Sequence, residues 1–125
     1  MDRAAVQRWL DDYVTAWKSY DPAAIGALFT EDATCQYHPY DEPIVGREAI
    51  VDSWVAPDRR DPPNTYDAHY EPLVIEGDTD VTHGRSRYFE ADGVTLKTEF
   101  DNIFVLRLTP NGQCAEFREW YMERR

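Results

Sequence analysis

The sequence predicts an α+β domain in which three helices and one early strand precede a four-strand antiparallel meander. Helical spacing of apolar residues dominates roughly the first half of the chain. From residue 65 onward, apolar and polar residues alternate, which is typical of half-buried strands. Clusters of Gly, Pro, Asn and Asp separate the successive units. The whole chain, residues 1–125, therefore fits one domain with a single core.

The first two predicted helices lie next to each other. Residues 2–20 carry apolar side chains on one helical stripe, namely Val6, Trp9, Leu10, Tyr13, Val14 and Trp17. Asp21 is a suitable N-cap and Pro22 suits a first helical turn. We therefore expect a second, short helix over residues 22–29.

An early strand and a third helix follow. Residues 33–38 (ATCQYH) have the composition of a strand, which Pro39 ends. Gly46 precedes a helical segment over residues 47–55, and Pro57 closes it.

Turn residues divide the rest of the chain into four strands. We expect them over residues 65–77, 79–91, 94–108 and 113–124. The third of these strands has apolar residues on both faces: Phe100, Phe104, Leu106 and Leu108 on one, and Ile103 and Val105 beside Asp101 on the other. An antiparallel sheet usually leaves one face in water, so something must cover the second face. We predict a homodimer through the sheet, and the alternative is a sheet that curls and covers itself.

Composition narrows the class of partner. The net charge of −11 argues against nucleic acid and against anionic membrane surfaces, which attract Lys and Arg. No apolar run approaches the roughly 20 residues that span a bilayer, and the charged N-terminus has no secretory signal, so a cytoplasmic location is expected. Cys35 and Cys114 are far apart, and no metal-ligand spacing or phosphate-binding loop is present. We therefore expect neither metal nor cofactor.

The chain resembles the nuclear transport factor two-like superfamily, and most of all its SnoaL-like and ketosteroid isomerase-like branch. The resemblance rests on YVTAWKSYDPAAIGALFTEDAT, a following His-Pro, GREAIVDSW, and four strands ending in EWYMERR. It implies a cone-shaped curved antiparallel sheet wrapped around the N-terminal helix, with a pocket at the open end. Members of this superfamily include isomerases, dehydratases, cyclases, hydrolases and non-catalytic proteins, so function must be argued from the site.

The resemblance implies two catalytic residues. Ketosteroid isomerases hold a developing enolate oxygen with a tyrosine and a neutral carboxylic acid, while a carboxylate base moves the proton. The tyrosine of that family aligns with Tyr13, and its acid, in an apolar-Asp-polar-apolar strand motif, aligns with Asp101 in FDNIF. An apolar pocket would raise the pKa of Asp101 and let it donate a hydrogen bond. Alternatively, Asp101 and Tyr13 only satisfy each other's hydrogen bonds, or Asp101 pairs with Arg85 or Arg87 on the neighbouring strand.

The position of the family's base falls on CQYHP, which departs from the family pattern. An ungapped alignment places Tyr37 there, and a shift of one residue places His38 there. Strand alternation favours Tyr37 inward and His38 outward unless a bulge intervenes. His38 has the better pKa for general acid–base work, so it joins Tyr13 and Asp101 as a catalytic candidate.

Aromatic residues supply the candidate ligand contacts, namely Trp17, Tyr37, Trp54, Tyr88 and Trp120. Such a pocket would suit a flat polyketide-like or steroid-like molecule, although the same side chains could be plain core. The sequence thus predicts a small cofactor-free pocket protein that performs enolate-type isomerisation, cyclisation or dehydration. The alternative is a non-catalytic small-molecule-binding or structural homodimer.

Overall fold

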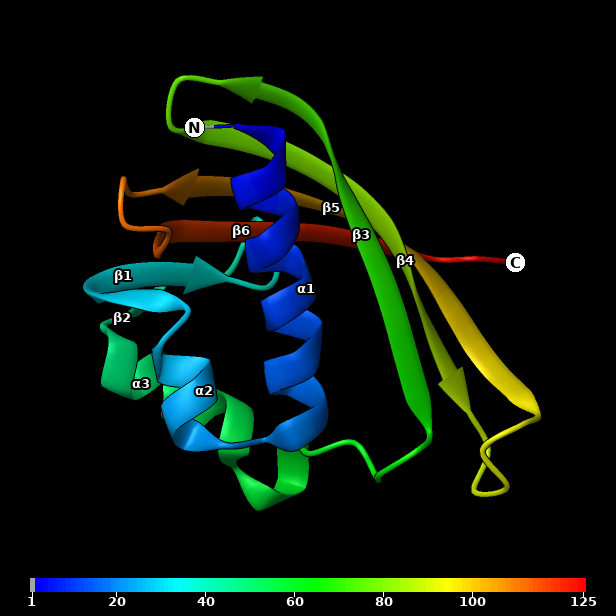
Figure 1. Ribbon diagram of the computed structural model, residues 1–125. Coiled ribbons are helices and arrows are strands. Elements are labelled where there is room, and N and C mark those ends of the chain that lie inside the picture. Colours follow the sequence, from blue (N-terminus) through cyan, green and yellow to red (C-terminus); the bar gives the residue numbers. More distant parts are fainter. Residues whose placement is uncertain (1) are drawn as a thin grey trace.

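Figure 1 shows the computed structural model, which describes residues 2–125. The helical elements are α1 (Arg3–Ser19), α2 (Pro22–Gly26), α3 (Arg47–Val55) and the 3-10 turn η1 (Pro57–Arg59). The strands are β1 (Phe29–Gln36), β2 (Ile44–Val45), β3 (Tyr66–Glu76), β4 (Thr79–Phe89), β5 (Leu96–Leu108) and β6 (Cys114–Glu123). The predicted α+β class and the four-strand meander are confirmed. The two-residue strand β2 was not predicted.

The six strands form one sheet in the order β2-β1-β6-β5-β4-β3. The β1–β6 pair is parallel and the other neighbouring pairs are antiparallel. The long strands β3, β4 and β5 bend strongly, and α1 lies against the concave side of the sheet (Figure 1). The sheet is curved and unclosed, which confirms the expected cone wrapped around the N-terminal helix.

The caps of α1 explain where this helix begins and ends. The side chain of Asp2 accepts a hydrogen bond from the Ala5 amide at 2.8 Å, which satisfies one of the free donors of the first turn. Tyr20 adopts the left-handed conformation (φ 49°) after the last turn and donates its amide proton to the Ala16 carbonyl. Within residues 2–125, no helix is both long enough and apolar enough to cross a membrane.

The buried stripe of α1 packs on the inward side chains of the sheet. Val6, Trp9 and Leu10 are buried, and the Trp9 indole donates to the Leu28 carbonyl at 2.9 Å. The sheet supplies Phe104, Leu106, Leu108 and Phe117 to the same cluster. This end of the cone is therefore filled core, and any ligand space has to lie toward the C-terminal end of α1.

The inward face of β5 shows which polar residue of the FDNIF motif points into the cone. Asn102, Phe104, Leu106 and Leu108 are buried, whereas Asp101 and Ile103 are exposed. The large side chains from Phe104 to Leu108 fix this phase because they fill the core under α1. The expectation that Asp101 points into the cone is therefore wrong, and the inward polar residue of the motif is its neighbour Asn102.

Candidate functional site

Tyr13 lies at the centre of an aromatic cluster inside the cone. Its ring stacks on Phe117 at 5.6 Å between centroids, and it meets the ring of Trp54 edge-on at 5.1 Å. The rings of Tyr70 and Phe104 lie 6.0 and 5.6 Å away. Packing on four sides holds this phenol in one orientation, which a positioned catalytic donor requires.

A cavity of about 190 Å³ opens beside this cluster. The residues that line it come from α1 and its C-cap, from the residue after β1, from α3, and from η1 and the loop that follows it; they are Tyr13, Trp17, Tyr20, Tyr37, Ser53, Trp54, Arg59 and Asp61. The structure thus brings four predicted site residues, Tyr13, Trp17, Tyr37 and Trp54, to one cavity. Their roles in binding and catalysis stay predictions.

The hydroxyl of Tyr13 is available for a ligand. It makes no hydrogen bond to any of residues 2–125, and the side chain keeps 8% of its surface exposed. Burial raises the pKa of Tyr13 well above its usual value, and the nearby carboxyl of Glu119 adds to the effect. The phenol is therefore neutral at physiological pH and can donate a hydrogen bond.

Glu119 on β6 carries an interior carboxyl group, although it is not among the residues that line the cavity beside Tyr13. One of its oxygens accepts a hydrogen bond from the Asn102 side-chain amide at 2.9 Å, and the Ser86 hydroxyl in turn donates to Asn102 at 3.1 Å. Burial raises the pKa of Glu119 from 4.5 to about 7, while the bond from Asn102 acts in the opposite direction. A carboxyl group with such a pKa can take up or release a proton near neutral pH.

Several phenols surround Glu119. Its carboxyl group raises the pKa of Tyr13, Tyr70, Tyr88 and Tyr121, in each case after the larger effect of burial. These tyrosines belong to α1, β3, β4 and β6, so the carboxyl group lies where four elements converge. The sequence interpretation had assigned the raised carboxyl pKa to Asp101 instead.

His38 lies at the rim and does not line the cavity that Tyr13 borders. Its Nδ1 is 2.8 Å from the Asp41 carboxylate and its Nε2 is 2.6 Å from the Tyr121 hydroxyl. The ring also stacks on Tyr40 at 5.1 Å between centroids. Tyr37, by contrast, lines the cavity, with its hydroxyl 3.4 Å from that of Ser53. Of the two open alternatives, Tyr37 thus faces inward.

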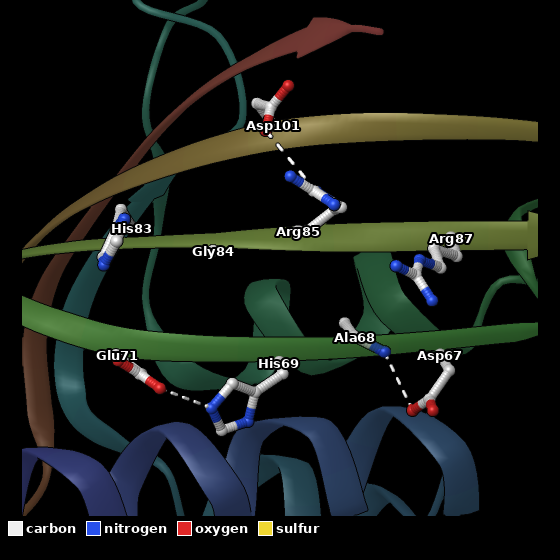
Figure 2. Close-up of a pocket in the computed structure, with 9 residues that line it drawn as sticks. All are labelled: Asp67, Ala68, His69, Glu71, His83, Gly84, Arg85, Arg87 and Asp101. Atoms are coloured by element: carbon white, nitrogen blue, oxygen red, sulfur yellow. Dashed lines mark hydrogen bonds and ion pairs between the residues drawn. The ribbon is translucent and has the colours of Figure 1, made fainter.

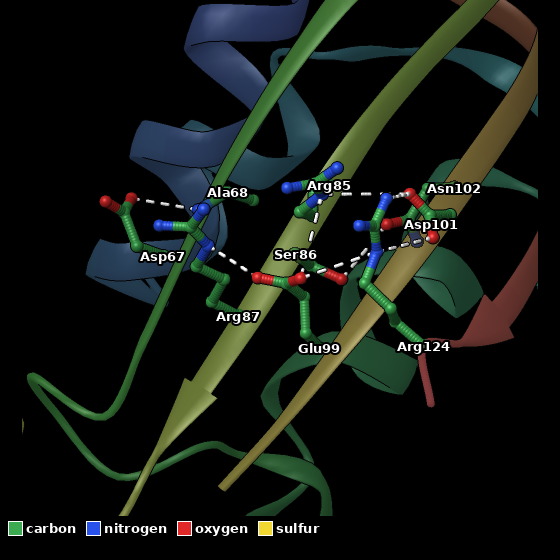
Figure 3. A network of polar contacts seen from close by, with 9 residues as sticks. All are labelled: Asp67, Ala68, Arg85, Ser86, Arg87, Glu99, Asp101, Asn102 and Arg124. Atoms are coloured by element: carbon green, nitrogen blue, oxygen red, sulfur yellow. Dashed lines mark hydrogen bonds and ion pairs between the residues drawn. The ribbon is translucent and has the colours of Figure 1, made fainter. Parts of the chain in front are cut away.

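Asp101 is held on the outer face by guanidinium groups (Figure 3). Arg124 donates to both of its carboxylate oxygens at 3.1 Å, and Arg85 Nε lies 3.7 Å away. These partners, Arg124 first, lower the pKa of Asp101. Asp101 therefore stays ionised at neutral pH and is not a neutral acid that donates to an enolate.

Two of the predicted ligand contacts lie elsewhere. Trp120 is on the outer face, where Arg118 lies 5.7 Å above its ring, so the expectation that it lines the interior is wrong. The cause is the phase of β6, which turns Phe117 and Glu119 inward and the alternate residues Arg118 and Trp120 outward. Tyr88 is half-buried beside Trp17, with 6.1 Å between the rings, and is not among the residues that line the cavity.

A second cavity, of about 440 Å³, lies on the outer face over β3, β4 and β5. Figure 2 shows that its walls carry mixed charge, from carboxylates, two arginines and the imidazoles of His69 and His83. His69 is 3.0 Å from Glu71, and Arg85 is close to Asp101. Among residues 2–125, no group of three or more His, Cys, Asp or Glu side chains is arranged to hold a metal ion.

Sequence reasoning missed Glu119 and Asn102, although a signal existed for each. Asn102 shares its face of β5 with Phe104, Leu106 and Leu108, the largest apolar set on that strand. Glu119 lies two positions after Phe117, and strand alternation places both on one side. The bulk of the side chains on one face of β5 would have found Asn102, and alternation from Phe117 would have found Glu119.

Fold and site together define a small α+β cone protein with an aromatic cavity and an interior acid, Glu119, whose carboxyl group acts on the phenol of Tyr13 that borders the cavity. The sequence profile of the SnoaL-like domain family matches residues 10–117, and the chain belongs to this family. A comparison with curated proteins gave no match.

Two solved structures share this fold. A ketosteroid isomerase-like protein from Erwinia carotovora atroseptica superposes with a TM-score of 0.63 at 20% identity, over 96% of this chain and 95% of that chain. An NTF-2 like protein of unknown function from Burkholderia xenovorans superposes with a TM-score of 0.68 at 15% identity, over 98% of this chain and 86% of that chain. At these identities the likeness concerns the fold alone.

Proposed function

We propose that this protein binds a small, largely apolar carbonyl compound and moves a proton next to the carbonyl group without a cofactor. Isomerisation, cyclisation and dehydration all begin with this step. The observation that carries the proposal is Glu119, an interior carboxyl group with a pKa of about 7 beside a neutral, unbonded phenol. Fold resemblance alone would not carry it, because one fold hosts many chemistries.

The proposed chemistry uses two side chains of this chain. The carboxylate of Glu119 takes the proton from the carbon next to the carbonyl, and the electron pair of that C–H bond moves to the carbonyl oxygen. The hydroxyl of Tyr13 donates a hydrogen bond to the resulting enolate oxygen. Protonated Glu119 then returns the proton to the same or another carbon, which leaves the enzyme unchanged.

The cavity volume limits the ligand. Pockets for drug-sized ligands measure about 300–1,000 Å³, and the cavity beside Tyr13 measures about 190 Å³. We therefore propose a compound of one or two rings, smaller than the steroid-like molecule expected from the sequence. Its flat faces would pack between Trp17, Tyr37 and Trp54.

Deuterium exchange tests the proposal without knowledge of the natural product. A two-ring ketone such as 2-tetralone is incubated in D₂O with the protein, and NMR follows the loss of its α-proton signals. We expect the protein to accelerate the exchange and Glu119→Gln to abolish the acceleration. Tyr13→Phe should lower the rate by a factor on the order of 10²–10³, the usual effect of losing one oxyanion donor.

Glu116→Gln is the matched control, because this residue lies on the same strand but pairs with Arg107 and Arg118 on the outer side. The Glu116→Gln variant should accelerate the exchange of the ketone as much as the wild-type protein does. Wild-type activity in Glu119→Gln would overturn the assignment of the base. No acceleration by the wild-type protein across one- and two-ring ketones would overturn the catalytic proposal.

The second candidate function is non-catalytic binding of a small molecule. It is favoured by the positions of the candidate acid–base groups, since Asp101, His38 and Glu119 are all absent from the residues that line the cavity beside Tyr13. In that case a ligand should stabilise the fold without turnover. At 100 times its Kd, a ligand raises the free energy of unfolding by about 2.7 kcal/mol, which a thermal-shift measurement detects.

A further inference from the structure

The mouth of the cavity combines aromatic side chains with one carboxylate. Tyr13 and Trp17 come from α1, Tyr20 from its C-cap, Tyr37 from the residue after β1 and Trp54 from α3. Five aromatic side chains thus line a cavity of about 190 Å³. The negative faces of such rings attract organic cations, and cages of this kind recognise quaternary ammonium groups.

Asp61 adds a fixed negative charge to this mouth. Its carboxylate accepts hydrogen bonds from the Trp17 indole at 3.2 Å and from the Tyr20 hydroxyl at 3.3 Å. The Asp61 amide donates to that same hydroxyl at 2.8 Å, so both backbone and side chain are held in place. Asp61 is partly buried, and it forms no ion pair with any cation in residues 2–125.

The two arginines of this segment differ in their contacts. Arg60 donates to the Val55 carbonyl at 2.9 Å and lies 5.5 Å above the Tyr20 ring, so one aromatic ring at the mouth already holds a cation. Arg59 lines the cavity but is exposed to solvent, where water screens its charge. Of the two charged side chains that line the cavity, only the carboxylate is partly buried, and the net charge of −11 adds a long-range attraction for cations.

We propose that the ligand of this cavity carries a compact organic cation, a quaternary or tertiary ammonium group, which lies between the aromatic side chains next to Asp61. The inference uses the same cavity as the proposed function but concerns binding alone, so it holds whether or not proton transfer occurs. Combined with the proposed function, it makes the substrate a small carbonyl compound with an ammonium group.

A pair of probes with the same shape and different charge tests the proposal. Choline carries a trimethylammonium group, and 3,3-dimethylbutan-1-ol replaces it with a neutral tert-butyl group. Calorimetric titration of the wild-type protein should show choline binding about tenfold or more tightly than the alcohol, since a desolvated cation–π contact contributes about as much as a tenfold change in Kd. Added salt should weaken the binding of choline and leave the alcohol unaffected.

Variants separate the contributions of the carboxylate and the rings. Asp61→Asn keeps a hydrogen-bond acceptor for Trp17 and Tyr20, and it should weaken choline binding about tenfold. Asp12→Asn, which removes an equal charge from the exposed side of α1, should change nothing. Arg59→Gln should tighten the binding, because it removes the opposing charge. Trp54→Leu should weaken it more than Trp54→Phe, which keeps an aromatic face.

Three results would overturn the inference. One is equal affinity for choline and the alcohol, or no binding of choline and tetramethylammonium at millimolar concentration. Another is choline binding that neither Asp61→Asn nor Trp54→Leu reduces. The third is that 2-naphthoate binds more tightly than choline and that Arg59→Gln abolishes this binding, which would assign an anionic ligand to the cavity. None of these readouts depends on deuterium exchange, so the two proposals fail separately.

Discussion

At the scale of single residues, the ionisation of Glu119 governs the expected pH dependence. Burial raises the pKa of this carboxyl group to about 7, and only the ionised form can accept a proton. The rate of α-deuteration should therefore rise as pH increases from about 5 and level off above about 8, with a midpoint near the raised pKa. A rate that is flat across this range would show that another group is the base.

Asn102 lowers that midpoint, against the larger effect of burial. Its amide donates to the ionised carboxylate of Glu119 and so lowers the pKa of that group. Asn102→Ala should move the midpoint of the rate profile to higher pH, because the ionised form loses its hydrogen bond. Ser86→Ala, one step further along the chain of hydrogen bonds, should shift it less. An unchanged midpoint in Asn102→Ala would contradict this role.

The buried carboxyl group of Asp80 leads to a prediction about stability that does not depend on the proposed function. It is 1% exposed; one oxygen accepts a bond from the Thr82 hydroxyl, and the other has no hydrogen-bond partner in residues 2–125. Burial raises the pKa of Asp80, against the effects of Thr82 and of Arg3. The folded state thus holds the proton more tightly than the unfolded state, and stability falls as pH rises through the raised pKa.

Asp80→Asn removes this effect. At neutral pH the variant should be more stable than the wild type by about 1–2 kcal/mol, since a buried unpaired charge is lost. The difference should shrink toward about pH 4, where the wild-type carboxyl becomes neutral. Urea unfolding of both proteins at several pH values measures this difference in the free energy of unfolding and its decrease. Asp78→Asn, at the exposed β3–β4 turn, is the control, and equal or lower stability of Asp80→Asn at neutral pH would contradict the prediction.

Individual side chains were harder to place from sequence than the elements that carry them. Both faces of β5 are apolar, so alternation alone left open whether Asp101 or Asn102 points inward. In β6, hydrophobicity favours Trp120 inside and Glu119 outside, and the structure has the reverse. An interior acid violates the pattern that stability prefers, and such violations are expected at functional sites.

At the scale of elements, the close approach of β3 and β4 depends on Gly84. This residue is opposite Tyr70, whose ring lies over it on the inward face. A Cβ on Gly84 would lie 2.2 Å from the His69 carbonyl oxygen and 2.4 Å from the Tyr70 ring. A side chain would therefore separate the two strands and displace an aromatic ring of the cone interior.

Gly84→Ala should destabilise the fold by about 3 kcal/mol, the upper part of the usual range for overpacking. Gly26→Ala is the matched control. Its added Cβ would have ordinary contacts of 3.6 Å with Arg47 and Val51, in a helix where alanine is preferred. Chemical denaturation measures both, and a Gly84→Ala variant as stable as the wild type would show that β3 can move away without cost.

The elements themselves were largely predictable, because each carries a local signal. The helices begin at caps such as Asp2 and Asp21, and turn glycines separate the meander strands. The early strand was placed at residues 33–38, but β1 runs over Phe29–Gln36. Its N-terminal half is fixed by parallel pairing of Phe29 with Cys114, a contact between distant segments that no local pattern reports.

At the scale of the whole molecule, the outer face of the sheet divides into a charged part and an apolar part. The charged part is a network in which Arg85, Arg87 and Arg124 surround Glu99 and Asp101 (Figure 3). Next to it, a groove of about 600 Å³ includes Ile103, Trp120 and Met122, which are 37%, 37% and 75% exposed. A contiguous exposed apolar surface on a sheet marks an interaction site.

We propose that a second copy of the chain covers this groove, as the apolar outer face of β5 predicts. The neighbouring network carries both signs of charge, so two identical faces related by a two-fold axis can pair arginines with carboxylates.

Sedimentation velocity should show a dimer, and Ile103→Lys combined with Trp120→Lys should give a folded monomer. Val94→Lys places the same charge on an apolar residue of the β4–β5 turn that is 79% exposed, and it should leave the dimer intact. Ile103 and Trp120 both line the groove, and a stable dimer buries at least about 1,000 Å² in total. The two lysines would therefore lie within the buried contact. A monomeric wild-type protein at micromolar concentration would mean that the curved sheet leaves this face in water.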